Sequence, residues 1–170
     1  MRNYYKTECL KRAKKLYDEG NYDSLIYVSL ELRQCIESIM YEKLESYRKS
    51  IPDIGFRKWQ PNHALKTLLY FEPDAEQNMK IAIAPESSPG VTSGPFQYLG
   101  EHKALTVKWL DKNYNKLGSY LHVQRGKSKI LSYEKLQSEL KLIIDKLDEV
   151  IKCNLTSCSM AERVIFECHA

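Results

Sequence analysis

Hydrophobic residues recur at three- and four-residue steps in several stretches of this chain, which is the period of an amphipathic α-helix. The clearest stretch runs from Asp23 to Tyr47, where charged residues such as Glu31 and Lys43 mostly occupy the positions between the apolar ones. The apolar stripe consists of Leu25, Val28, Leu32, Cys35, Ile36, Ile39, Met40 and Leu44. A stripe of this length predicts a long helix that packs against the rest of the core.

Further helices are predicted on both sides of the long one. A shorter apolar stripe over 4–17 predicts a first helix, and Gly20 is expected to end it. Asn21 or Asp23 is a suitable N-cap for the long helix that follows. Pro61 fits the first turn of a short third helix. Periodicity over 105–122 predicts another, and Ser132 is expected to cap the last. The stripe of this last helix consists of Leu136, Leu140, Ile143, Leu147, Val150 and Ile151.

The stretch over 72–100 has a different character, because prolines, glycines and serines interrupt it repeatedly. Within it, Met79–Ile83 alternates in the way of a short strand, and Phe96–Leu99 is expected to pair with it. The insertion is too short to hold a core of its own. We therefore predict a mostly α fold, a four- to five-helix bundle with a small β-hairpin insertion, over residues 1–152 and followed by a tail over 153–170.

Composition fits one globular domain and changes this picture little. The chain has 170 residues, of which 43% are hydrophobic and 28% are charged, and its net charge of +4 permits an anionic partner without requiring one. It shows no long apolar run and no apolar segment after the first charges, so we expect no membrane span and no secretory signal. An odd number of cysteines favours reduced thiols and a cytoplasmic location, with Cys9 and Cys35 as small core residues.

Arg33 and Glu37 lie four residues apart at the edge of the long stripe, a spacing that allows an ion pair across one helical turn. Such pairs are most often surface contacts that contribute only a few tenths of a kcal/mol. Because both residues flank the apolar stripe, they are also candidates for a half-buried cleft or a dimer interface.

The segment Leu117–His122 ends a predicted helix and is followed by the basic residues Arg125 and Lys127. Gly118 inside a helix requires a reason, such as close packing. His122, beside Ser119 and Tyr120, is placed to act as a general acid or base on a phosphodiester, with neighbouring cations binding the phosphate. The alternative is a histidine that only interacts with the dipole at a helix C-terminus.

The tail contains three cysteines and a histidine: Cys153, Cys158, Cys168 and His169. These residue types bind zinc with tetrahedral geometry, although their spacing is irregular for a zinc ribbon. The sequence therefore allows the beginning of a zinc-ribbon-like element here. No other cofactor is expected, because no dinucleotide-binding, P-loop, serine-hydrolase or H-E-x-x-H motif occurs.

The helical segment Leu30–Glu37, followed much later by Leu117–His122, resembles the HEPN superfamily. The resemblance covers about 23–152 without the insertion. It implies a four- or five-helix bundle that forms homodimers. It further implies a place in bacterial or phage conflict systems, including toxin–antitoxin systems, with RNA or a protein of such a system as the partner. Many members are metal-independent endoribonucleases.

The chain departs from the catalytic motif of that superfamily, in which an arginine and then a polar residue precede the histidine, with a gap of four to six positions. His122 matches the histidine, but Lys116 stands at the position of the arginine. Arg33 or Arg125 is then needed as the bidentate phosphate ligand, because lysine lacks the planar fork. In this interpretation Glu37 orients Arg33. Two functions follow as the main hypotheses: an RNA-binding endoribonuclease with a degenerate motif, or a non-catalytic dimerisation, sensor or adaptor module that uses the insertion as its contact surface. A third hypothesis is a zinc-dependent nucleic-acid binder that acts through the cysteines of the tail.

Overall fold

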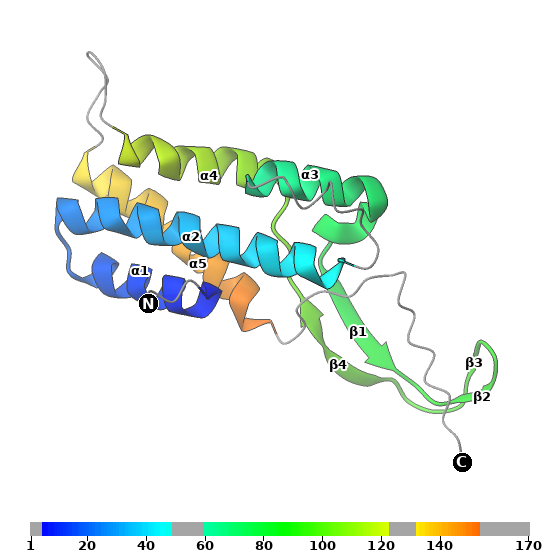
Figure 1. Cartoon of the computed structure of the whole chain (residues 1–170). Helices are drawn as coiled ribbons and strands as arrows, with labels where there is room; N and C mark the ends of the chain where they lie inside the picture. Colours follow the sequence, from blue (N-terminus) through cyan, green and yellow to red (C-terminus); the bar gives the residue numbers. More distant parts are fainter. Residues whose placement is uncertain (1–4, 49–59, 123–131, 154–170) are drawn as a thin grey trace.

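The computed structural model describes residues 5–48, 60–122 and 132–153. In these residues the chain forms a helical bundle with a β-hairpin at one end (Figure 1). The five α-helices are α1 (Lys6–Asp18), α2 (Tyr22–Ser46), α3 (Pro61–Phe71), α4 (Val107–Leu121) and α5 (Tyr133–Lys152). The predicted fold class, a mostly helical bundle with a small β insertion, is confirmed.

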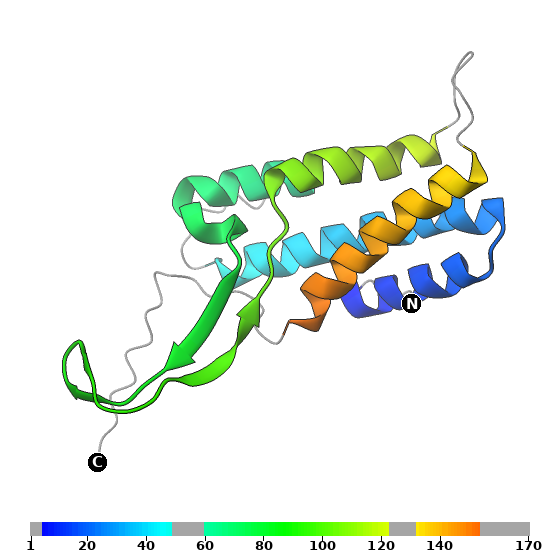
Figure 2. The same cartoon turned by 180° about the vertical axis from the view of Figure 1, so that it is seen from behind.

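The long helix α2 is the centre of the bundle and contacts each of the other four helices. Figures 1 and 2 show α1 beside α2, α5 crossing behind it, and α3 and α4 following one another along the opposite side. The predicted stripe of α2 is buried, with only Ile39 partly exposed. Cys9 and Cys35 are fully buried core residues, as predicted.

The helix ends follow the capping signals of the sequence. Gly20 adopts a φ of +68°, a left-handed conformation that suits glycine after a helix. Of the two candidate caps for α2, Asn21 is the one used, because its Oδ1 accepts a hydrogen bond of 2.8 Å from the amide of Ser24. Ser132 caps α5 through the amide of Lys135, as predicted.

The insertion begins with a short 3-10 helix, η2 (Pro73–Glu76), and continues as a hairpin that projects from the bundle (Figure 2). Strand β1 (Met79–Ile83) has the predicted bounds and pairs antiparallel with β4 (Gln97–His102). The tip carries the short pair β2 (Glu86–Ser88) and β3 (Val91–Thr92). The second long strand extends to His102, beyond the predicted end of the insertion at residue 100, because Met79 pairs with His102 at the base of the hairpin.

Two charged residues expected between the apolar positions of α2 are instead buried. Glu31 is 3% exposed, and its Oε2 accepts a hydrogen bond of 3.0 Å from Nε of Arg12 on α1. Lys43 is 7% exposed and donates to the backbone carbonyl of Ala75 in η2. Both burials depend on partners from other elements, which the periodicity of α2 does not reveal. None of the described helices combines the length and apolarity that a membrane span requires.

Candidate functional site

Arg33 on α2 lies across one face of α4. Its Nη1 donates a hydrogen bond of 3.0 Å to the backbone carbonyl of Tyr114, and its guanidinium carbon lies 3.9 Å from the centre of the Tyr114 ring. The second contact is a cation–π interaction. Arg33 forms no other hydrogen bond with the described residues, so most of its five N–H donors remain available to a ligand.

Gly118 provides the space that Arg33 occupies. A Cβ atom at this position would lie 2.5 Å from Nη1 of Arg33, which is closer than non-bonded atoms approach. The glycine is buried inside α4, where alanine favours the helix by about 1 kcal/mol. The close approach of Arg33 is therefore a reason for a glycine at this position.

Glu37 contacts the same tyrosine from the other side. The hydroxyl of Tyr114 donates to Oε1 of Glu37 over 2.5 Å. Burial of the ring, followed by this hydrogen bond to a carboxylate, raises the pKa of Tyr114 well above its ordinary value. The direct ion pair predicted between Arg33 and Glu37 does not form in the described structure; both side chains bind Tyr114 instead.

His122 is the C-cap of α4 and is exposed to solvent. Tyr114, Gly118 and His122 follow one another at four-residue steps, so they share one face of the helix. Neighbouring positions on such a face have Cβ atoms about 5–6 Å apart. Arg33 lies against Gly118, and Gly118 stands four positions, about one helical turn, before His122. We call this surface, formed by Arg33, Glu37, Tyr114, Gly118 and His122, the α2–α4 site.

Lys116 lies on a different face of α4, directed toward α5. Its Nζ forms an ion pair of 3.2 Å with Oε1 of Glu139, and the hydroxyl of Tyr120 donates to the other carboxylate oxygen. Burial opposes ionisation of Glu139, yet the hydrogen bonds from Tyr120 and Lys116 hold its pKa below the ordinary value. The structure therefore does not bring Lys116 and Tyr120 together with Arg33.

The remaining predicted site residues divide by whether the structure describes them. Ser119 is exposed, and its hydroxyl donates to the carbonyl of Lys116 over 2.7 Å. Cys153 donates to the carbonyl of Glu149 over 3.3 Å. The part of the chain that the structure describes holds no group of three potential metal ligands. The other predicted site residues lie outside the described residues: Arg125, Lys127, Cys158, Cys168 and His169.

Sequence reasoning missed the role of Tyr114, which it assigned only to the apolar stripe of α4. The available signal was its position four residues before Gly118 and eight before His122. A tyrosine combines a ring for core packing with a hydroxyl that needs a polar partner when it is buried. Glu139, the shared partner of Lys116 and Tyr120, was also missed. Its partners lie on another helix, so the pattern within α5 does not reveal them.

The described fold and site define a helical bundle with a half-buried arginine–tyrosine–glutamate network beside an exposed histidine. Comparison with known proteins adds no relative: no protein-family model, no curated protein and no solved structure gives a significant match to this chain.

Proposed function

We propose that this chain is a HEPN-like, dimeric, cytoplasmic protein of a bacterial or phage conflict system, and that its α2–α4 site engages RNA. The observation that carries the proposal is the position of Arg33 against Gly118, one turn of α4 before His122. The proposal requires that a phosphate bound by Arg33 at this position also contacts the imidazole of His122. The missing arginine of the superfamily motif is thus supplied by α2 instead of α4.

In this proposal the candidate reaction is metal-independent cleavage of a phosphodiester. Arg33 binds the phosphate through its remaining N–H donors and stabilises the charge that develops on it. His122 transfers the proton as general acid or base, which requires solvent access, and the residue is exposed. Tyr114 and Glu37 position Arg33 through the ring contact and the buried hydrogen bond. A dimer would place two such sites around one groove.

The test is cleavage of end-labelled RNA in EDTA by the wild type and by His122→Ala. General acid–base catalysis contributes about 100-fold or more, so His122→Ala is expected to reduce the rate at least that much. Arg33→Lys keeps the charge but lacks the planar fork, and we expect a loss of about tenfold or more. His63→Ala and Arg48→Ala remove an exposed histidine and an exposed arginine elsewhere, and both are expected to retain full activity.

Equal inactivity of the wild type and His122→Ala would eliminate the enzyme but leave RNA binding open. Binding is then measured by fluorescence anisotropy at several salt concentrations, because contacts to phosphates weaken as salt rises. Arg33→Ala is expected to weaken binding and to reduce the salt dependence. Affinity that is unchanged in Arg33→Ala would contradict the proposed site.

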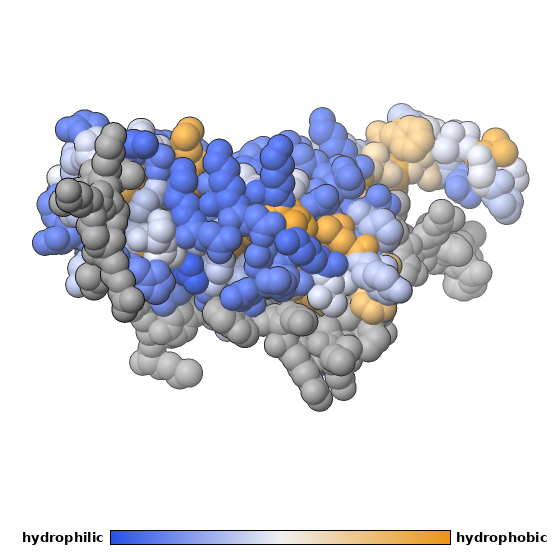
Figure 3. Space-filling model, turned by 90° about the horizontal axis from the view of Figure 1, so that it is seen from above, coloured by the Kyte–Doolittle hydropathy of each residue, from blue (hydrophilic) through white to orange (hydrophobic). Residues whose placement is uncertain are grey.

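One observation favours the second candidate function, a non-catalytic dimerisation, sensor or adaptor module. The hairpin exposes several large apolar side chains: Ile83 (45%), Val91 (53%), Phe96 (69%), Tyr98 (58%) and Leu99 (42%). Figure 3 shows apolar groups toward this end of a face that is otherwise largely hydrophilic. Exposed apolar groups that lie close together often mark a protein contact.

The two functions separate in one pair of measurements on Phe96→Ser/Tyr98→Ser. If the hairpin is the contact surface of an adaptor, the double variant loses self-association or partner binding in light scattering. If the α2–α4 site acts on RNA, the same variant retains RNA cleavage or binding. Loss of partner binding in a chain that never turns over RNA would favour the adaptor.

A further inference from the structure

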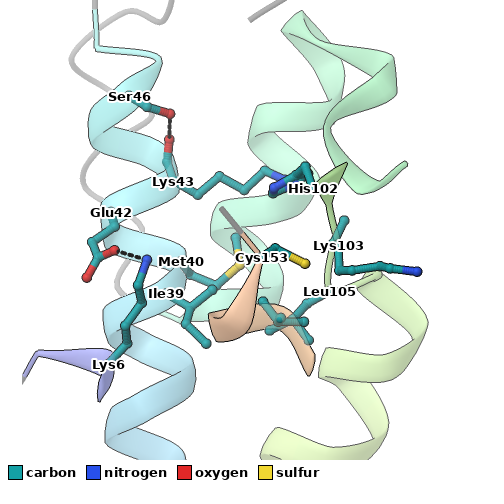
Figure 4. Close-up of a pocket in the computed structure, with 12 residues that line it drawn as sticks. Lys6, Ile39, Met40, Glu42, Lys43, Ser46, His102, Lys103, Leu105 and Cys153 are labelled. Carbon is teal, nitrogen blue, oxygen red and sulfur yellow. Dashed lines mark hydrogen bonds and ion pairs between the residues drawn. The ribbon is translucent and has the colours of Figure 1, made fainter. Parts of the chain in front are cut away.

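A second site lies at the other end of α2, where it meets the base of the hairpin and the last turn of α5. A pocket of about 110 Å³ opens here between the three elements (Figure 4). Ile39, Met40, Leu105 and Val150 form apolar walls, while Lys43 and His102 supply polar groups. At about 30 Å³ for each water in the liquid, this volume corresponds to roughly four waters.

Lys43 and His102 are both 7% exposed, which is unusual for ionisable side chains. Figure 4 shows Lys43 extending from α2 toward His102 at the end of β4. The ammonium of Lys43 has three donors, and the described structure provides one acceptor, the carbonyl of Ala75. Two donors of a buried cation thus remain for a ligand or for water.

The other two lysines that line the pocket each have a carboxylate partner. Nζ of Lys6 lies 2.5 Å from a carboxylate oxygen of Glu42, and Nζ of Lys103 lies 3.6 Å from one of Glu149, which also pairs with Lys146. Lys43 forms no ion pair with a carboxylate of the described residues. Burial lowers the pKa of Lys43 to about 8, against a weaker opposing effect of Glu76, so most of it remains charged at neutral pH.

We propose that this pocket binds a small aliphatic carboxylate. The carboxylate accepts hydrogen bonds from Nζ of Lys43 beside His102, and the aliphatic chain packs against Ile39, Met40, Leu105 and Val150. One buried ammonium without a carboxylate partner among the described residues, that of Lys43, matches a monoanion better than the dianion of a phosphate. The apolar walls favour a ligand with a short hydrocarbon chain over a bare inorganic ion. This proposal is independent of the α2–α4 site and of RNA.

Isothermal titration calorimetry of the full chain with butyrate tests the proposal. We expect saturable binding with a dissociation constant on the order of millimolar. Acetate tests the contribution of the hydrocarbon chain, and butyramide tests the contribution of the charge. Inorganic phosphate tests the preference for a monoanion. Each of the three is expected to bind more weakly than butyrate. Absence of saturable binding, or equal binding of butyrate and butyramide, would overturn the proposal.

Variants locate the binding within the molecule. Lys43→Met removes the cation and is expected to weaken butyrate binding about tenfold or more. Lys112→Met is the matched control, because Lys112 is an exposed lysine on α4 away from this pocket. Ile39→Phe keeps both polar groups but fills the apolar wall, and it is also expected to weaken binding. Unchanged affinity in Lys43→Met would overturn the assignment.

A labelling experiment covers the case in which Lys43→Met does not fold. The wild type is treated with limiting acetic anhydride with and without butyramide or butyrate, and acetylated lysines are identified by peptide mass spectrometry. Butyrate is expected to protect Lys43 and to leave Lys112 unchanged, whereas butyramide protects neither. Equal acetylation of Lys43 in all samples would count against a carboxylate in this pocket.

Discussion

Nη1 of Arg33 lies 2.5 Å from the point that a Cβ atom of residue 118 would occupy, so the position of Arg33 depends on a glycine in another helix. The contact joins α2 to the last two turns of α4. It makes the arginine of one segment and the histidine of the other parts of one surface.

This relationship predicts a coupling between the two positions. Gly118→Ala is expected to stabilise the helix by about 1 kcal/mol through its higher helix propensity. The added methyl group, however, displaces the end of Arg33. The hydrogen bond and the cation–π contact that are then lost contribute together about 1–2 kcal/mol. We expect little net change in the free energy of unfolding. In the Arg33→Ala background, the same substitution is expected to stabilise by about 1 kcal/mol. A double-mutant cycle from urea unfolding measures the difference, and additive effects would contradict the contact.

Removal of the Tyr114 hydroxyl is expected to destabilise the bundle. Tyr114→Phe keeps the ring beneath Arg33 but leaves Oε1 of Glu37 without its donor, at a cost of about 1–2 kcal/mol. Urea unfolding at neutral pH measures this loss. Tyr27→Phe, which alters an exposed tyrosine of α2, is the control and is expected to change stability by less than about 0.5 kcal/mol.

The same tyrosine predicts an alkaline limit to stability. Burial and the hydrogen bond to Glu37 raise the pKa of Tyr114 in the folded state, whereas the unfolded chain ionises near its ordinary pKa of about 10. The stabilisation is therefore complete below pH of about 10 and is lost as pH rises toward the folded pKa. Thermal unfolding between neutral and strongly alkaline pH should show a smaller loss for Tyr114→Phe than for the wild type.

Lys43 predicts the opposite trend with pH. Because burial lowers its pKa to about 8 in the folded state, the unfolded chain binds more protons between that value and the ordinary pKa. Stability from this group rises as pH increases through this interval. Lys43→Met removes the cost of burying the cation but leaves the carbonyl of Ala75 unpaired, and we expect a net gain of about 1–2 kcal/mol at neutral pH. The gain should shrink above pH of about 9, and a constant difference would contradict the buried charge.

Glu139 predicts a loss of stability in acid. Burial opposes its ionisation, but hydrogen bonds from Tyr120 and Lys116 hold its pKa below the ordinary value. The stabilisation is present above the ordinary pKa and is lost as pH falls through the folded one. Glu139→Gln is expected to destabilise by about 1 kcal/mol at neutral pH and to approach the wild type in acid. Guanidinium unfolding at both pH values measures the effect, with exposed Glu134→Gln as the control.

Lys116 and Arg33 show that spacing in the sequence does not by itself identify which side chains lie near one another. Spacing placed Lys116 at the motif position before His122, yet its side chain is directed to Glu139 on α5. Arg33 is far away in sequence, yet it lies against Gly118, which stands one turn of α4 before His122. The difference follows from the helix period, because Lys116 and His122 are six positions apart and such a step places them on different faces.

The sequence by itself determined the local structure of this protein: the stripe of α2, the Ser132 cap of α5 and the strand Met79–Ile83. These features depend on residues within one or two turns of each other, so periodicity and capping chemistry suffice to predict them. Only the tertiary structure decided which polar groups are buried and what they contact. Tyr114 links Arg33 to Glu37, and Lys43 enters a pocket, because acceptors and space come from helices distant in sequence. The free energy of burying a charge is set by those partners, which no local pattern contains.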